Sequence, residues 1–184
     1  TQETIFVCDL GGGTFDATLV ECEYNHNYVE TLSTDGNSEL GGSDWTARLE
    51  DLLLDEIEAD TGVDLRTASG MAEQYWRVRK SAREAKHRLS EQMATNVTVP
   101  YVVPQEGYSL DTKITRDEFN EATHDLLKSI ESPINRVFND ADLGINDVDT
   151  VLLIGGASRM PQLSEFIEEY FGMSPSREIS PDKA

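Results

Sequence analysis

The sequence predicts an α/β fold whose core is split by an inserted α+β subdomain. Three observations indicate this. Short apolar strand patterns joined by turns open the chain. An unbroken apolar run at 150–154 is typical of a strand buried on both faces, as in a parallel sheet. Two helical patterns and a hairpin lie between them. We therefore expect a core from residues 1–39 and 115–184, with residues 40–114 as the inserted subdomain.

The first part of the core reads as an antiparallel meander. Strand patterns occur at residues 4–8, 15–23 and 28–34, with turns at 9–14 and 24–27. Because the turns are short, consecutive strands are expected to pair with each other, and the glycine-rich segment becomes the first turn of the meander.

The inserted subdomain is expected to hold two helices and a hairpin. Ser43 is a plausible N-cap of the first helix and Gly62 its stop. The second helix is expected over residues 67–90. Strand patterns at 94–103 and 108–114 are joined by a short turn, which predicts the hairpin.

The second part of the core begins with a helix. Thr115 and Glu118 have the spacing of a capping box, which opens a long apolar stripe. Pro133 lies inside this stripe and should kink the helix or begin a second one. The strand at 150–154 follows, and then a helix at about 161–171.

Residues 9–16, DLGGGTFD, are the most informative stretch of the chain. Consecutive backbone N–H groups in a glycine turn can form a concave nest for an anion, and Thr14 can add a hydroxyl donor. Asp9 could hold a divalent cation through its waters. The alternative is a tight hairpin with a glycine bulge. The order of acid, glycines, hydroxyl and a second acid, Asp16, favours phosphate binding, and the other common phosphate-loop motifs are absent from the sequence.

Two further segments can approach a ligand. Gly155-Gly156 stands between a strand and a helix, an arrangement in which a phosphate or sugar approaches strand ends, although a close turn without ligand is the alternative. Arg83, Lys86 and His87 share one helix face with Ser90. Such a face can bind a ribose and stack on a base, although a solvated charged face is the ordinary explanation.

Charge and cysteines restrict the class of protein. The chain has 15 basic and 35 acidic residues, a formal net charge of −20. This charge excludes nucleic acid and anionic membranes as expected partners. Cys8 and Cys22 have no zinc spacing and are expected to be buried reduced thiols, which suits the cytoplasm. The sequence shows no signal peptide and no apolar run of membrane-spanning length.

Residues 9–16 resemble the second phosphate loop of DnaK-type heat-shock chaperones, members of the actin and sugar-kinase superfamily. The resemblance extends in family order to residues 40–44, 84–90, 154–161 and 179–184. It implies the second lobe of a nucleotide-binding domain, with a ribonuclease-H-like (actin-like ATPase) core and an inserted upper subdomain. The implied cofactors are ATP or ADP with Mg²⁺, and K⁺ as a further ion.

The resemblance also implies the site residues. Asp9 lies near the magnesium and Asp16 near a bound cation. Cofactor contacts are implied for Gly11, Gly12, Gly13, Thr14, Gly42, Lys86, His87, Ser90, Gly155, Gly156, Arg159 and Asp182. The sequence departs from the family pattern at three positions, where the family usually has Glu, Arg and Ser: Arg83, His87 and Ala157. The ribose and adenine contacts therefore depart from the family more than the phosphate contacts do.

The expected function is that of a second-lobe fragment of a chaperone ATPase domain. The intact protein would use Mg-ATP to drive capture and release of unfolded peptide. Implied partners are the missing first lobe, a substrate-binding domain, a J-domain co-chaperone, and a nucleotide-exchange factor on residues 40–114. No catalytic residue is expected here, since these lie in the first lobe, and the chain alone is expected to be inactive. The alternatives are a non-catalytic actin-fold scaffold and, less favoured, a sugar or glycerol kinase.

Overall fold

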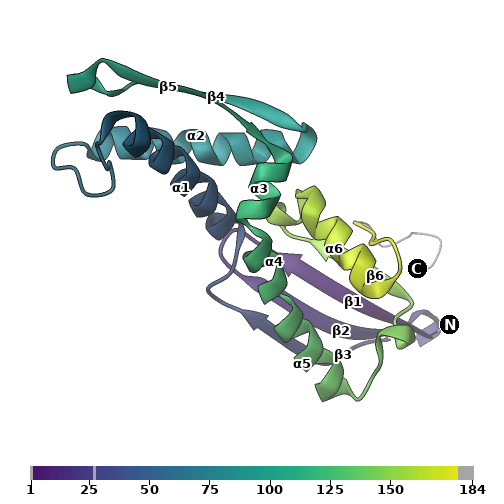
Figure 1. The fold of residues 1–184 in the computed structure, drawn as a ribbon. Helices are drawn as coiled ribbons and strands as arrows, with labels where there is room; N and C mark the ends of the chain where they lie inside the picture. Colours follow the sequence, from purple (N-terminus) through teal and green to yellow (C-terminus); the bar gives the residue numbers. More distant parts are fainter. Residues whose placement is uncertain (1, 27, 178–184) are drawn as a thin grey trace. The chain divides into compact units, whose positions relative to one another are not determined.

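The computed structural model describes residues 2–26 and 28–177 (Figure 1). The chain divides into two compact units. Unit 1 is formed by the described residues of 1–43 and 125–184, and unit 2 by residues 44–124. Among the described residues, none of the helices combines the length and the apolar character needed to cross a membrane.

Unit 1 is built on a four-stranded sheet with the order β3-β2-β1-β6. Strands β1 (Gln2–Leu10), β2 (Phe15–Glu23) and β3 (Tyr28–Asn37) form the antiparallel meander that the turn pattern predicts. Strand β6 (Thr150–Ile154) pairs with β1 in parallel, as its unbroken apolar run indicates. The mixed α/β class predicted from the sequence is thus the class of the observed fold.

Two helices cover one face of this sheet (Figure 1). They are α5 (Glu131–Ala141) and α6 (Pro161–Phe171). Aromatic rings from these helices and from β1 pack against one another. The Phe6 ring of β1 lies 5.7 Å from that of Phe138 and 4.7 Å from that of Phe171, measured between centroids. Arg136 of α5 also bonds Asp35 of β3, so this helix is tied to the sheet by both apolar and ionic contacts.

The two cysteines are free thiols. Cys8 is buried in β1, and burial raises the pKa of its thiol to about 12, with the neighbouring Asp9 adding to the shift. Cys22 is only half-buried, so the expectation of a buried thiol is met by Cys8 but not fully by Cys22.

Unit 2 contains two long helices and a hairpin. Helix α1 (Gly42–Thr61) begins just before the unit, α2 is Ala72–Glu91, and the hairpin is β4 (Ala94–Val103) with β5 (Tyr108–Thr115). The predicted N-cap is wrong, because α1 already begins at Gly42 and Ser43 lies within its first turn. The predicted stop is confirmed, since Gly62 adopts a left-handed φ of 72°.

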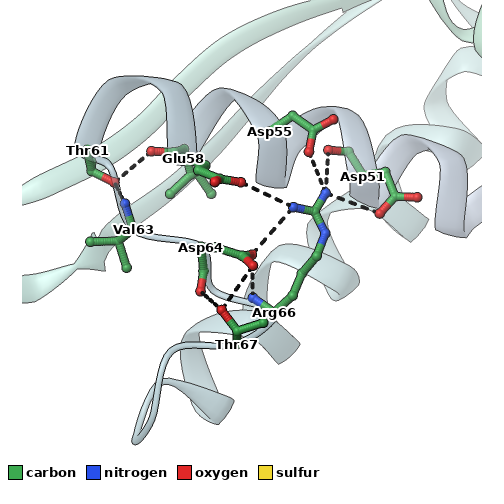
Figure 2. Close-up of polar contacts among 9 residues, drawn as sticks. Asp51, Asp55, Glu58, Thr61, Val63, Asp64, Arg66 and Thr67 are labelled. Atoms are coloured by element: carbon green, nitrogen blue, oxygen red, sulfur yellow. Dashed lines mark hydrogen bonds and ion pairs between the residues drawn. The ribbon is translucent and has the colours of Figure 1, made fainter.

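The loop between α1 and α2 replaces the predicted first turn of the second helix. Gly70 has a φ of 78°, which a right-handed helix cannot contain, so α2 starts at residue 72 instead of 67. Figure 2 shows how Arg66 fastens this loop to α1. Its guanidinium lies 2.6 Å from Asp55, 3.3 Å from Asp51 and 3.8 Å from Glu58.

The long helix predicted after residue 115 is divided into three. The predicted capping box is confirmed, with Thr115 and Glu118 bonding each other's backbone at the start of α3 (Arg116–Ala122). Helix α4 (His124–Ser129) follows a break at Thr123, whose hydroxyl donates to the Phe119 carbonyl at 2.8 Å and competes with the helix ladder. Pro133 lies in the first turn of α5, so it belongs to a separate helix rather than a kink.

Candidate functional site

The first glycine turn joins β1 to β2. The last residue pair of β1 and β2 is Leu10 with Phe15. The Gly11 N–H then donates to the Thr14 carbonyl at 2.9 Å, which adds one more pair to the ladder and leaves Gly12 and Gly13 at the tip of the turn. A Cβ added to either tip glycine would meet nothing within 4 Å, and neither residue has a positive φ. A hairpin alone therefore does not require glycine at the tip. The missing side chains leave the amides of an exposed turn open to a ligand.

The segment before α1 packs directly on this turn. Gly42 N–H donates to the Gly11 carbonyl at 2.9 Å, and Ser43 N–H donates to the Gly12 carbonyl at 2.8 Å. A Cβ on Gly41 would lie 2.4 Å from the backbone of Gly13. Gly41 is therefore glycine because two backbones meet there, and the segment fixes the turn from one side.

The second glycine turn follows β6. Gly155 has φ 88° and ψ 153°, a conformation that is essentially restricted to glycine. A Cβ there would lie 2.3 Å from the Leu10 carbonyl oxygen and 2.4 Å from Asp9 Oδ1, whereas a Cβ on Gly156 would meet nothing within 4 Å. The second turn therefore packs through Gly155 on the end of β1, from which the first turn leaves, and Gly156 leaves open space beside it.

Ser158 holds this second turn, a role that the sequence analysis missed. Its side chain is buried, and its hydroxyl donates to the Gly155 carbonyl at 2.7 Å. Its own carbonyl accepts from Arg177 Nη2 at 2.9 Å. A serine three residues after a glycine is a typical local turn pattern and could have indicated this bond. Arg159, the predicted adenine contact, is exposed at the end of the same turn.

Two carboxylates stand at the base of the first turn. Asp9 and Asp16 are direct partners in the β1–β2 register, and Asp9 also pairs with Ile154 of β6. Asp9 is half-buried and Asp16 is exposed. Within residues 2–26 and 28–177, no three potential metal-ligating side chains gather. Two hard oxygen donors fit a magnesium ion that keeps most of its waters and binds phosphate oxygens.

Unit 2 holds three further predicted site residues, all on α2. Lys86 is only 8% exposed, and its pKa falls to about 8 because burial and the positive Arg83 disfavour its charge, while Asp44 opposes the shift. Burial, followed by the charges of Lys86 and Arg83, also lowers the pKa of His87. The Ser90 hydroxyl donates to the Lys86 carbonyl at 3.3 Å.

The structure therefore brings together most of the predicted phosphate and metal residues, from three segments of unit 1. Lys86, His87 and Ser90 share one helix of unit 2. Asp182 lies outside the described residues.

Comparison with known proteins identifies the family. The family model "Hsp70 protein" matches residues 1–184. The chain is 37% identical over 186 residues to "Chaperone protein DnaK" from Thermotoga petrophila and from Thermotoga maritima, and 36% identical over 185 residues to that from Thermosipho africanus. Each match covers 100% of this chain and 30% of the relative, so the chain spans about a third of their length. The resemblance drawn from the glycine motifs is confirmed, and the chain belongs to the Hsp70 family.

Proposed function

We propose that this chain is the second lobe of the ATPase domain of a DnaK-like chaperone and binds the phosphates of Mg-ATP or Mg-ADP on its glycine turns. The observation that carries the proposal is the difference between its glycines. Gly41 and Gly155 are required by packing, but Gly12, Gly13 and Gly156 have open space where a side chain would stand. Glycine at an open position without positive φ is most simply explained by a ligand that approaches the backbone.

The proposed fold is a ribonuclease-H-like core with an inserted subdomain. The sheet order β3-β2-β1-β6 supports this core. In this sheet β1 belongs to the antiparallel meander and also pairs in parallel with the later strand β6. The division of the chain into two compact units supports an insertion. We assign it to residues 40–114 between core segments 1–39 and 115–184, whereas the compact unit itself runs from 44 to 124.

In this proposal each part of the first turn has a chemical role. The amides of residues 11–14 and the Thr14 hydroxyl donate to β- and γ-phosphate oxygens. Magnesium would supply charge neutralisation, with Asp9 orienting its waters and Asp16 close to a bound cation, Mg²⁺ or K⁺. Gly155 and Gly156 approach the α-phosphate and sugar. On family resemblance alone, Gly42, Lys86, His87, Ser90, Arg159 and Asp182 contact the nucleoside.

Hydrolysis is proposed for the intact protein and not for this chain alone. Phosphoryl transfer needs charge neutralisation and an oriented water, and the family supplies these in part from its first lobe. The proposed partners are accordingly that lobe, a substrate-binding domain that captures unfolded peptide, a J-domain co-chaperone, and a nucleotide-exchange factor on residues 40–114. The proposed location is the cytoplasm.

A non-catalytic scaffold is the second candidate. The replacement of family residues at Arg83, His87 and Ala157 favours it, because these changes fall on the proposed nucleoside contacts. A scaffold that had lost nucleotide would not need its tip glycines, so the two candidates differ in what these residues do.

Calorimetric titration of the intact protein with Mg-ADP tests the proposal. Gly12→Val places a branched side chain over the open amides, and the loss of one hydrogen bond to a charged phosphate should weaken binding by about 10- to 150-fold. Gly144→Ala, a glycine of the same unit without positive φ, is the control and should bind as the parent does. Absence of binding by the parent protein, or equal affinity of the Gly12→Val variant, would refute the proposal.

A further inference from the structure

The basic side chains of α2 differ in whether the protein itself satisfies them. Four of them have partners within unit 2. Arg77 donates to Pro100 O (2.6 Å) and Arg88 to Thr95 Oγ1 (2.6 Å), while Arg79 and Lys80 form ion pairs with Glu50 (3.7 Å) and Glu84 (3.9 Å). In the part of the chain that the structure describes, Arg83 and His87 have neither a hydrogen bond nor an ion pair. Among the arginines of the described residues, Arg159 of unit 1 is likewise unpaired, although the chain has 35 acidic and only 15 basic residues.

Arg83 lies on the same side of the helix as a buried lysine. Arg83, Lys86 and His87 are spaced three and four residues apart, so they form one surface, the cationic face of α2. Lys86 is 8% exposed, whereas Arg83 and His87 are exposed. After the larger effect of burial, the charge of Arg83 lowers the pKa of Lys86, and the charges of Lys86 and Arg83 lower the pKa of His87.

Two carboxylates offset this face only in part. Asp44 favours the charged form of Lys86, and Glu84 favours that of His87. Glu84, however, is one residue away from Arg83, about 100° around the helix, and its carboxylate lies 3.9 Å from Lys80. The face therefore presents cations with little local compensation, which is an arrangement that an anion would stabilise.

The chemistry of the face indicates which anion. Guanidinium and ammonium groups donate hydrogen bonds and accept none, while a ribose hydroxyl is best recognised by a carboxylate that accepts its proton. In dinucleotide-binding folds an acid recognises the free 2′-hydroxyl and an arginine accommodates a 2′-phosphate. The Ser90 hydroxyl, the remaining polar group on this side, already donates to the Lys86 carbonyl.

We propose that the cationic face of α2 binds a phosphate carried on the ribose of a nucleotide. This inference rests on the proposed function, in which α2 contacts the nucleoside. It assigns to Arg83 a specificity-determining role, and it names the ligand class as nucleotides phosphorylated at the 2′- or 3′-position.

The test compares three probes by calorimetry with the intact protein and magnesium: ADP, 2′-phospho-ADP and 3′-phospho-ADP. One added charge-assisted hydrogen bond should make at least one phosphorylated probe bind about 10- to 150-fold more tightly than ADP. The ratio of the two phosphorylated probes identifies the position of the phosphate.

Charge-reversal variants connect the preference to this face. Arg83→Glu should abolish the preference or reverse it, and because Arg83 is exposed and unpaired among the described residues, the variant should fold. Lys113→Glu, an exposed position on β5, makes the same charge change elsewhere in unit 2 and should keep the preference. Binding of ADP with no gain from the extra phosphate, or a preference that survives Arg83→Glu, overturns this inference alone. Failure of all three probes to bind overturns the proposed function as well.

Discussion

Alanine substitutions at Gly155 and Gly156 should have opposite effects, although the two residues are adjacent. Gly155 has φ 88°, and a Cβ there would lie 2.3 Å from the Leu10 carbonyl oxygen. Gly156 has no positive φ, and its Cβ would meet nothing within 4 Å. The first substitution should therefore damage the fold, while the second should damage only ligand binding.

The magnitudes follow from the two local geometries. The backbone conformation of Gly155 costs a non-glycine residue about 1–3 kcal/mol, and the steric overlap adds about 1–3 kcal/mol. Gly155→Ala should thus lower the melting temperature on the order of 5–20 °C. Gly156→Ala restricts the unfolded chain and should raise stability by up to about 1 kcal/mol. If the added methyl group costs one hydrogen bond to phosphate, affinity for Mg-ADP should fall about 10- to 150-fold.

Differential scanning calorimetry and Mg-ADP titration of the intact protein separate the two effects. Gly144→Ala is the control for both, because this glycine is not left-handed and its Cβ would approach only the Asp147 carboxylate, at 3.4 Å. Affinity of Gly156→Ala equal to that of the parent would show that the open glycines are not a ligand surface. An unchanged melting temperature for Gly155→Ala would show that the close contact with β1 is not what requires glycine.

Three further substitutions test the loop before α2, the buried Lys86 and the capping box of α3. Arg66→Ala removes the shared partner of Asp51, Asp55 and Glu58. Because exposed ion pairs contribute about 0.2–1 kcal/mol each, the free energy of unfolding should change little. Limited proteolysis, however, should cut within residues 62–71 faster than in the parent protein. Lys86 has a pKa of about 8 in the folded chain, against an ordinary 10.5. Between these pH values the folded chain binds fewer protons than the unfolded chain, so the free energy of unfolding should rise from pH 8 to pH 10.5. Urea denaturation should show this rise in the parent and a smaller rise in Lys86→Met. Thr115→Ala removes the capping box of α3 and should cost about 1 kcal/mol, or roughly 2–4 °C in melting temperature, whereas Thr112→Ala on β5 serves as a nearby control.

Local patterns were sufficient to predict most of the strands and helices. The strand at Phe15–Glu23 and the helix at Pro161–Phe171 have the predicted bounds, because strand alternation, N-terminal proline and C-terminal glycine are all local signals. The break at Thr123 was missed, because the apolar stripe continues through it and the competing bond is made by one hydroxyl. The start of α2 was placed too early, because the polar residues before Gly70 fit a helix face as well as a loop.

The candidate site could be predicted only in part. The order of residues in the first glycine motif indicated a phosphate turn, and the two acids that flank it are indeed paired across β1 and β2. The sequence could not distinguish Gly41 and Gly155, which are required by close backbone contacts, from Gly12 and Gly156, which are open. That distinction depends on which strands and segments become neighbours, and such contacts join residues far apart in the sequence, Gly41 with Gly13 and Gly155 with Leu10.

The position of Asp9 follows from its place in the sheet and not from a bond made by its side chain. Asp9 lies at the end of β1, which is paired on one side with β2 and on the other with β6, and its direct partners are Asp16 and Ile154. Because β1 and β6 are parallel, both glycine turns leave the same edge of the sheet, where parallel strands commonly place ligands. The absence of a side chain on Gly155 makes room for the Asp9 carboxylate. The acid and both turns are therefore held by one strand ladder, which fixes their positions without a ligand and would lower the ordering cost of the proposed nucleotide binding.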